Sequence, residues 1–362
     1  MSDKKIAVIG AGNSGLCMTG HLLSEGYEVA LWNRPDEEPF EELCRAGTIS
    51  VHGALGGAFT PDLLTTSMEA AINDTPLILV AVPAHAHRAV MQQMAPLLQP
   101  GQCVVLNPGR TGGVWESRKI LSDAGKGEEI LLAETQTIVY TCRKTSPVDV
   151  LLIQFKQGVP LAAERPGEQQ KIWDMLPSCI SEKCTPAPSV LHTGFGNVGM
   201  ILHTAPTLFN IGWIESPKAR FRYYYEGITP SVAAFLEEMD NERLAVAKAY
   251  GADVPRVSQW MQAAYCLPNE NTGLHAMIQA NHSYAEIDAP TSLEHRYLHE
   301  DVATGLVPLN ELGRLVECPT PHIDLVIGLA SSILKVDFHA TGRNLDRMGL
   351  SSMSADQVMY KS

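Results

Sequence analysis

The sequence has few basic residues, no long apolar run and no paired cysteines. Lysine and arginine total 27 against 40 acidic residues, which leaves a net charge of −13. This excess argues against nucleic acid and anionic membranes as partners, because both attract basic patches. No apolar run approaches the ~20 residues of a membrane span. The run after Lys4 and Lys5 stops at Gly10, too short for a secretion signal. We therefore expect a cytoplasmic protein.

The eight cysteines are scattered, and none belongs to a Cys-x-x-Cys pair or to a His/Cys cluster with metal-ligand spacing. Scattered cysteines in a chain of enzyme size are typical of reduced core thiols, so we predict no metal site. The 362 residues, of which 45% are hydrophobic, are enough for two globular domains with a core in each.

The first half of the chain alternates strand and helix patterns. Short apolar runs predict strands, and the longer periodic stretches between them predict helices. The expected strands are 6–9, 28–32, 77–82, 103–106 and 130–133, and the expected helices are 16–23 and 84–98. This alternation is typical of a doubly wound parallel sheet. Residues 148–155 have strand composition and are expected to extend that sheet.

The pattern changes near residue 185, where Thr-Pro-Ala-Pro at 185–188 resembles a linker. Beyond it strand patterns are rare, and Thr-Pro pairs at 229–230 and 320–321 predict helix starts, since Thr caps helices and Pro suits their first position. We predict the α/β class: an N-terminal Rossmann-type doubly wound parallel sheet domain at 1–186 and a C-terminal all-helical domain at 187–362.

The strongest motif is the glycine-rich segment GAGNSG, which follows the first expected strand and opens the first expected helix. In this context Gly10 allows a tight turn, Gly12 lets a pyrophosphate approach the backbone, and Gly15 lets the helix pack closely. The N–H groups at the helix start, around Asn13 and Ser14, then bind phosphates. The segment predicts a dinucleotide-binding site.

The residues after the second expected strand bear on the choice of cofactor. NAD enzymes usually place Asp or Glu there to bind the ribose 2′-hydroxyl, whereas this chain has Asn33 and Arg34. An arginine can pair with the 2′-phosphate of NADP, so we favour NADP(H). The alternative is NAD(H), with Asn33 at the ribose and Arg34 in solvent. Val82 and Pro83 end the next long strand and are expected near the nicotinamide.

Two further segments narrow the class of enzyme. One is Asn197-x5-His203, and the other is APTSLEHRYLHEDV at 289–302. With the glycine-rich motif, the turn NPGRTGG at 107–113 and the run DVATGLVPL from Asp301, they make the chain resemble the opine dehydrogenases (the octopine/nopaline dehydrogenase family). The bacterial enzymes of the N-(1-carboxyethyl)-norvaline type look most similar.

The resemblance implies an enzyme that couples an α-keto acid, often pyruvate, to the amino group of an amino acid and reduces the imine with NAD(P)H. It implies His203 as the catalytic acid–base, Asp301 as its partner carboxylate and Arg296 as the clamp for a substrate carboxylate. These types suit the roles, because the pKa of histidine lies near neutrality and arginine pairs with carboxylates. Relatives often have proline after this histidine, where this chain has Thr204.

Five more residues are weaker candidates for the substrate site: Asn197, Arg110, Glu134, Tyr140 and Arg143. Glu134 would receive the ammonium of an amino acid, and Arg143 would either serve a second carboxylate or form a structural salt bridge. The likeness to the norvaline type favours a neutral, apolar amino acid. The resemblance also implies a homodimer.

Two other classes remain as alternatives. One is a two-domain dehydrogenase of the ketopantoate-reductase or glycerol-3-phosphate-dehydrogenase type, which normally uses a lysine for proton transfer; the lysines here lie in no recognisable motif. The other is a non-catalytic NADP sensor, which would be expected to lose His203, Asp301 and Arg296. The particular amino acid, the keto acid and the direction of the reaction are left open.

Overall fold

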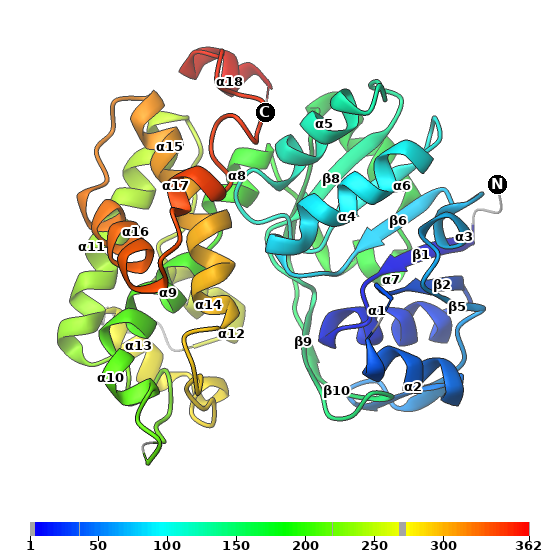
Figure 1. Cartoon of the computed structure of the whole chain (residues 1–362), viewed down its shortest axis with the longest axis horizontal. Helices are drawn as coiled ribbons and strands as arrows, with labels where there is room; N and C mark the ends of the chain where they lie inside the picture. The colour runs from blue at the N-terminus through cyan, green and yellow to red at the C-terminus, as the bar shows by residue number, and fades with distance from the viewer. Residues whose placement is uncertain (1–3, 36, 219, 268–272, 362) are drawn as a thin grey trace. The chain divides into compact units, whose positions relative to one another are not determined.

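The computed structural model describes residues 4–35, 37–218, 220–267 and 273–361 (Figure 1). The chain divides into two compact units. The first, the dinucleotide unit, runs through Thr193 and includes Lys361; the second, the helical unit, covers 194–360. The division falls at 193/194, against the predicted 186/187.

The dinucleotide unit is built on an eight-stranded sheet. Its strands, in spatial order, are β12 (Cys184–Pro186), β11 (Val159–Ala163), β8 (Leu131–Thr135), β7 (Cys103–Leu106), β6 (Leu77–Val80), β1 (Lys5–Ile9), β2 (Glu28–Trp32) and β5 (Leu63–Thr65). All neighbours pair in parallel except β11 and β8. The predicted doubly wound parallel sheet is confirmed.

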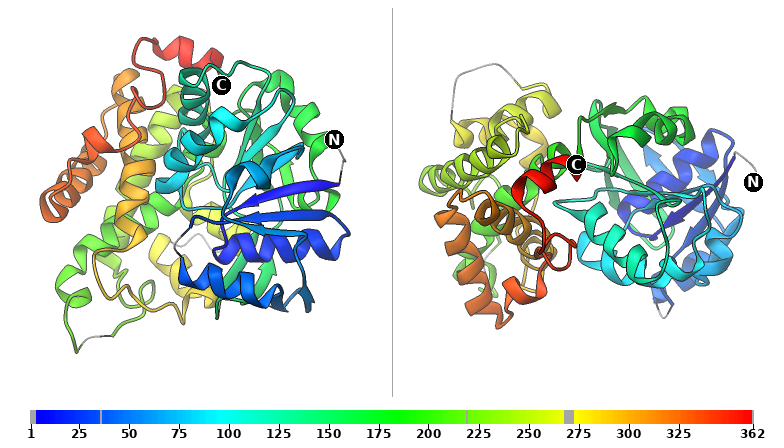
Figure 2. Two further views of the ribbon diagram at one scale, coloured as in Figure 1. Left: turned by 45° about the vertical axis from the view of Figure 1, so that its right-hand side comes forward. Right: turned by 90° about the horizontal axis from the view of Figure 1, so that it is seen from above.

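Helices of the dinucleotide unit flank this sheet (Figure 2). They are α1 (Asn13–Ser24), α2 (Glu38–Ala46), α3 (Met68–Ile72), α4 (His87–Met94), α5 (Gly113–Asp123), α6 (Gln169–Met175) and α7 (Ser178–Ser181), with 3-10 turns at 84–86, 95–97 and 166–168. The helix predicted over 84–98 is thus an α-helix with a 3-10 turn at each end. Helix α8 (Val190–Phe195) follows at the end of the unit.

One strand prediction and one linker prediction were wrong. Residues 148–155 do not extend the main sheet: β10 (Asp149–Phe155) belongs to a separate sheet with β9 (Tyr140–Lys144), β3 (Ile49–Gly53) and β4 (Gly57–Phe59). Strand β10 buries Val150 and Leu152 while Leu151 and Ile153 are exposed, a one-faced pattern that suits a sheet packed on one side. The supposed linker at 185–188 begins as the edge strand β12, a position that tolerates proline.

The helical unit consists of helices joined by connections of very different lengths. They are α9 (Gly199–Phe209), α10 (Ile211–Ile214), α11 (Pro230–Ala249), α12 (Val257–Tyr265), α13 (Leu274–Ala280), α14 (Arg296–His299), α15 (Val307–Leu315), α16 (Pro321–Leu334), α17 (Phe338–Thr341) and α18 (Ala355–Lys361), with a 3-10 turn at 282–284 and a π-turn, η5 (Val302–Leu306). Among the described residues its extended pairing is the single bridge Arg222–Asp288, and the predicted helical domain is confirmed.

The Thr-Pro pairs do start helices, though by different means. The Thr229 hydroxyl accepts a hydrogen bond from Val232 N at the start of α11, as a capping residue should. The Thr320 hydroxyl accepts instead from Asn310 Nδ2 at 2.8 Å, tying α16 to α15. In the described part of the chain, no helix combines the length and apolar character of a membrane span.

A buried arginine ties three segments of the helical unit together. Arg243, on α11, is fully buried and donates to Asp240 Oδ1 at 2.6 and 2.8 Å. It also donates to the carbonyls of Phe195 and Pro255, and the second oxygen of Asp240 accepts from Val257 N at the start of α12. The pair therefore fixes the ends of two neighbouring segments against α11.

We expect Arg243→Ala to lower the free energy of unfolding by about 3–5 kcal/mol, because it leaves Asp240 as an uncompensated buried charge. The exposed Arg256, which donates to Asn241, provides a matched control, and Arg256→Ala should cost less than about 1 kcal/mol. Urea unfolding followed by circular dichroism measures both. Equal losses would contradict a structural role for the buried pair.

Candidate active site

The glycine-rich loop joins β1 to α1 and has the shape that a pyrophosphate requires. Gly10 has φ +112°, and a Cβ there would lie 2.6 Å from Val82 Cγ1; a Cβ on Gly15 would lie 1.7 Å from the Gly10 carbonyl oxygen. A Cβ on Gly12 would meet no atom within 4 Å. A side chain at Gly10 or Gly15 would therefore clash with neighbouring atoms, whereas Gly12 leaves the backbone open to a ligand.

The start of α1 fits the phosphates of a dinucleotide. The first turn of this 12-residue helix contains no acidic residue, so its N–H groups and the positive end of its dipole are suited to bind an anion. The side chain of Asn13 accepts from Lys144 N at 3.0 Å, and the Lys144 ammonium donates to Ala11 O at 3.4 Å. Strand β9 therefore braces the loop.

The end of β2 contains a carboxylate that the sequence analysis missed. Asn33 Oδ1 accepts from Ala11 N at 3.4 Å, as suits a residue beside the loop. The carboxylate of Glu37, the residue before α2, forms an ion pair with Arg34 and accepts from Asn33 Nδ2 at 3.4 Å. The position after β2 therefore has Asn33 and Arg34 in place of an acidic residue, with the Glu37 carboxylate in contact with both.

Two of the weaker substrate candidates lie in the interior. Glu134, at the end of β8, is fully buried and accepts from the Thr193 hydroxyl at 2.6 Å and from Val114 N at 3.2 Å, at the start of α5. Tyr140 is fully buried with its hydroxyl 3.2 Å from His21 Nδ1, and burial raises its pKa well above the ordinary value. Both side chains are therefore held in the interior of the dinucleotide unit, and their role at the substrate stays a prediction.

The remaining candidates of this unit are cationic. Arg110 has a positive φ of 61° in the turn after β7, and Arg143 is exposed on β9. Lys156 is one of the lysines that lie in no recognisable motif, and its ammonium donates to the Thr137 hydroxyl at 3.2 Å. Burial, together with the smaller effect of the Arg110 charge, lowers the pKa of Lys156 to about 8.

In the helical unit the fold brings together His203 and Asp301, which are 98 residues apart. His203 lies on α9, and its Nδ1 is 2.8 Å from Oδ2 of the fully buried Asp301. Its Nε2 is 3.1 Å from the hydroxyl of Tyr224. Both nitrogens of the ring therefore have hydrogen-bond partners on other segments of the same unit.

Close packing of η5 on α9 sets the distance between His203 and Asp301. Asp301 directly precedes this π-turn, and a Cβ on Gly305 would lie 2.7 Å from Met200 Cβ and 3.2 Å from Asn197 Nδ2. Only glycine allows this approach. Asn197 is buried next to this turn, and a role for it in substrate binding stays a prediction.

A kink in α9 places the backbone of His203. Pro206 lies inside the helix and lacks the N–H that would bond to the Leu202 carbonyl. The Tyr223 hydroxyl lies 3.5 Å from that carbonyl and donates to the His203 carbonyl at 2.6 Å. The hydroxyl of Thr204, the next residue, donates to Met200 O at 2.7 Å.

Arg296 joins the cluster through an aromatic ring. Tyr297 stacks on the His203 ring with centroids 4.0 Å apart and planes 12° apart, and the Arg296 guanidinium lies 5.7 Å from the Tyr297 centroid. Arg296 is half exposed and pairs with Glu300 at 3.7 Å. Burial lowers the pKa of the neighbouring His295, and the charges of Arg296 and His203 lower it further.

The sequence analysis missed Tyr224 and Tyr297. Tyr297 stands inside the segment 289–302 that was singled out, next to Arg296. Tyr224 is the middle of three consecutive tyrosines just before the start of α11. This run was a usable signal, because three aromatic hydroxyls in succession are unusual so close to a helix start.

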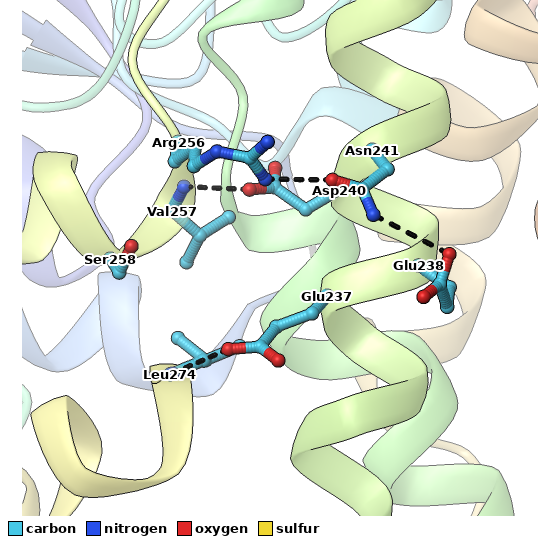
Figure 3. Close-up of a pocket in the computed structure, with 8 residues that line it drawn as sticks. All are labelled: Glu237, Glu238, Asp240, Asn241, Arg256, Val257, Ser258 and Leu274. Carbon is cyan, nitrogen blue, oxygen red and sulfur yellow. Dashed lines mark hydrogen bonds between the residues drawn. The ribbon is translucent and has the colours of Figure 1, made fainter. Parts of the chain in front are cut away.

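A polar pocket of about 300 Å³ lies elsewhere in the helical unit (Figure 3). Its carboxylates hold the ends of helices: Glu237 accepts from Leu274 N at the start of α13, and Asp240 accepts from Val257 N at the start of α12. Among the described residues, no group of three or more His, Cys, Asp and Glu side chains is arranged to hold a metal ion.

The glycine-rich loop of one unit and the His–Asp pair of the other define a two-domain NAD(P)-linked dehydrogenase. Residues 5–124 match the sequence model of the N-terminus of NAD-dependent glycerol-3-phosphate dehydrogenase. Residues 186–334 match that of the α-helical domain of NAD/NADP octopine/nopaline dehydrogenase. An opine dehydrogenase from Arthrobacter sp. (strain 1C) is 38% identical over 98% of each chain.

The chain therefore belongs to the opine dehydrogenase family. It is an NAD(P)-dependent oxidoreductase that acts on CH–NH groups by reductive condensation of a keto acid with an amino acid, which decides against both alternative classes. An octopine dehydrogenase solved with NADH and L-arginine has the same fold (TM-score 0.79, 21% identity, 99% of this chain and 98% of that one). So does a yersinopine dehydrogenase bound to NADP+ (TM-score 0.79, 17% identity, 100% and 98%).

Because both oxygens of Glu134 anchor other segments, we expect Glu134→Gln to act on stability. It should lower the free energy of unfolding by about 1.5–3 kcal/mol, the usual worth of hydrogen bonds to a charged group. The KM for the amino acid should stay near that of the wild type. A raised KM with unchanged thermal stability would instead return Glu134 to the substrate site.

Proposed function

We propose that this enzyme condenses pyruvate with a neutral, apolar L-amino acid and reduces the imine with NADPH, giving an N-(1-carboxyethyl) amino acid, and that it also runs the reverse oxidation. The observation that carries the proposal is the His203–Asp301 pair, buried in the helical unit of a chain that belongs to this family. The bound dinucleotide supplies the hydride.

In this proposal His203 is the general acid–base of imine formation. Asp301 accepts from Nδ1 and holds the ring in the tautomer whose Nε2 is a base. The ring takes a proton from the ammonium of the amino acid and returns one as water leaves the carbinolamine. Arg296, half exposed, holds a substrate carboxylate through paired hydrogen bonds.

The surroundings of His203 favour a neutral amino acid. The two carboxylates next to it already face cations or the imidazole: Asp301 pairs with His203, and Glu300 lies 3.7 Å from Arg296. Its other neighbours, Tyr224 and Tyr297, are aromatic. Such a site offers apolar contact rather than a counter-charge for a basic side chain.

For the cofactor, Gly10, Gly12 and Gly15 form the phosphate loop with Asn13 and Ser14 at the helix start. Asn33 and Arg34 take the adenosine ribose, and Val82 and Pro83 lie at the nicotinamide end. We favour NADP(H), because the Arg34 side chain is 75% exposed and able to leave Glu37 for a 2′-phosphate. We also propose that the enzyme is a cytoplasmic homodimer, which light scattering would test.

The test of the proposed function is oxidation of NADPH and NADH with pyruvate and single amino acids from a panel. Oxidation that needs both pyruvate and a neutral amino acid is expected, with NADPH preferred. Oxidation with a keto acid alone would move the enzyme to the hydroxy-acid dehydrogenases. A requirement for a basic amino acid would contradict the proposed substrate class.

We expect His203→Ala to lower kcat by about 10²–10⁴-fold, the usual contribution of a general acid–base. NADPH affinity, measured by fluorescence of the bound nucleotide, should stay normal, since the phosphate loop belongs to the other unit. Loss of NADPH affinity with kcat intact would contradict the proposed role.

We expect Arg34→Ala to weaken NADPH binding by about 1.5–3 kcal/mol, the worth of a charge-assisted hydrogen bond, with NADH little changed. Glu37→Gln should strengthen NADPH binding, because it releases Arg34 from a competing carboxylate. Titration of the wild type and of both variants with NADPH and with NADH measures these affinities. An equal effect of Arg34→Ala on both nucleotides would favour NAD(H) and a solvent role for Arg34.

A further inference from the structure

The nitrogen of His203 that must exchange a proton with substrate already has a hydrogen-bond partner. Asp301 takes Nδ1, and Tyr297 covers one face of the ring. The remaining nitrogen, Nε2, lies 3.1 Å from the Tyr224 hydroxyl. A proton that moves between Nε2 and a substrate therefore has to pass this hydroxyl or displace it.

Displacement is opposed by the packing around Tyr224. Its ring is 4% exposed and stacks on Tyr284 with centroids 4.1 Å and planes 18° apart. It also meets the ring of Tyr223 edge-on at 5.0 Å. The Tyr284 hydroxyl is in turn 3.3 Å from that of Tyr265. A ring held on two sides in this way keeps its hydroxyl at His203.

The hydroxyl also stays protonated at working pH. Burial raises the pKa of Tyr224 well above its ordinary value, and the neighbouring tyrosines add to the effect. A neutral phenol has one hydrogen to donate and lone pairs that accept. Tyr224 can therefore donate to a neutral Nε2, or accept from a protonated one, without carrying charge itself.

We propose that Tyr224 is a catalytic proton relay between the substrate nitrogen and His203, an inference that rests on the proposed function. As the ammonium of the amino acid gives a proton to the Tyr224 oxygen, the phenolic hydrogen passes to Nε2. The products are a neutral amine, a neutral Tyr224 and an imidazolium paired with Asp301. When water leaves the carbinolamine, the same path runs backwards: Nε2 gives its proton through Tyr224 to the departing hydroxyl.

Tyr224→Phe isolates the relay, because it keeps the ring and its stacking and removes only the hydroxyl. The charged and titratable groups around His203 stay in place: Asp301, the Arg296–Glu300 pair, and His295, whose ring packs edge-on against Tyr297 at 4.4 Å. A change in the pH dependence of the variant would therefore come from the hydroxyl.

The wild-type enzyme supplies the first test. Turnover of pyruvate with the best amino acid is measured in mixtures of H₂O and D₂O. A relay moves two protons together, so the rate should depend on the deuterium fraction along a curve. A linear dependence, or none, would overturn the relay without any variant having to fold.

Tyr224→Phe supplies the second test. Its kcat should fall about 10²-fold or more, within the range of general acid–base contributions, with little change in KM, a shifted pH profile and a linear dependence on deuterium. Tyr250→Phe is the matched control: Tyr250 is also buried and donates to Leu312 O at 3.0 Å, and its loss should leave kcat and the pH profile unchanged. Equal kcat values for Tyr224→Phe and the wild type would overturn the proposal.

A third measurement separates failure of the relay from failure of the proposed function. Nitrogen-15 NMR of histidine-labelled enzyme without substrate, with the His203 signals assigned by His203→Gln, reports on Nε2 directly. Tyr224→Phe should move the Nε2 resonance, and Tyr250→Phe should not. An Nε2 resonance unchanged in Tyr224→Phe overturns the relay even if the wild type turns over no keto acid and amino acid pair.

Discussion

The hydrogen bond between His203 and Asp301 depends on how closely the π-turn η5 approaches α9. Gly305 makes that approach, with room for no side chain beyond hydrogen, and it fixes Asp301 at the entry to the turn. Asp301 is fully buried, and the imidazole that faces it offsets part of the cost of burying a carboxylate. A side chain in place of Gly305 would push η5 away from α9 and lengthen or break the bond between His203 Nδ1 and Asp301 Oδ2.

Elsewhere in the helical unit, too, side chains supply hydrogen bonds to buried polar groups. Pro206 breaks the hydrogen-bond ladder of α9, and the Tyr223 hydroxyl serves the carbonyls of Leu202 and His203. Arg243 and Asp240 satisfy one another and three backbone groups. In each case a side chain from another segment forms the hydrogen bond that the backbone group needs when it is buried. The Tyr223 hydroxyl is thus a structural donor, and the hydroxyl of the neighbouring Tyr224 lies at Nε2 of His203.

Sequence patterns predicted those parts of the fold that depend on interactions between residues close together in the sequence. The glycine-rich loop, the buried strands and the Thr-Pro helix starts follow from short-range sterics and periodicity. His203, Asp301 and Arg296 came from likeness to a family, since nothing in spacing alone joins residues 98 apart. Glu37 and Tyr224 escaped notice because a turn or a packed neighbour, rather than a motif, brings them to the site.

The two units match the sequence models of different families. The dinucleotide unit matches a sequence model shared with glycerol-3-phosphate dehydrogenases over 5–124, because a phosphate loop on a parallel sheet serves any hydride donor. Residues 186–334, most of which belong to the helical unit, match the octopine/nopaline model, and this range contains His203 and Asp301. Selection for a new substrate can therefore alter the surroundings of His203 without disturbing the loop. The proposed cofactor preference depends instead on residues between β2 and α2, where Arg34 and Glu37 form an ion pair.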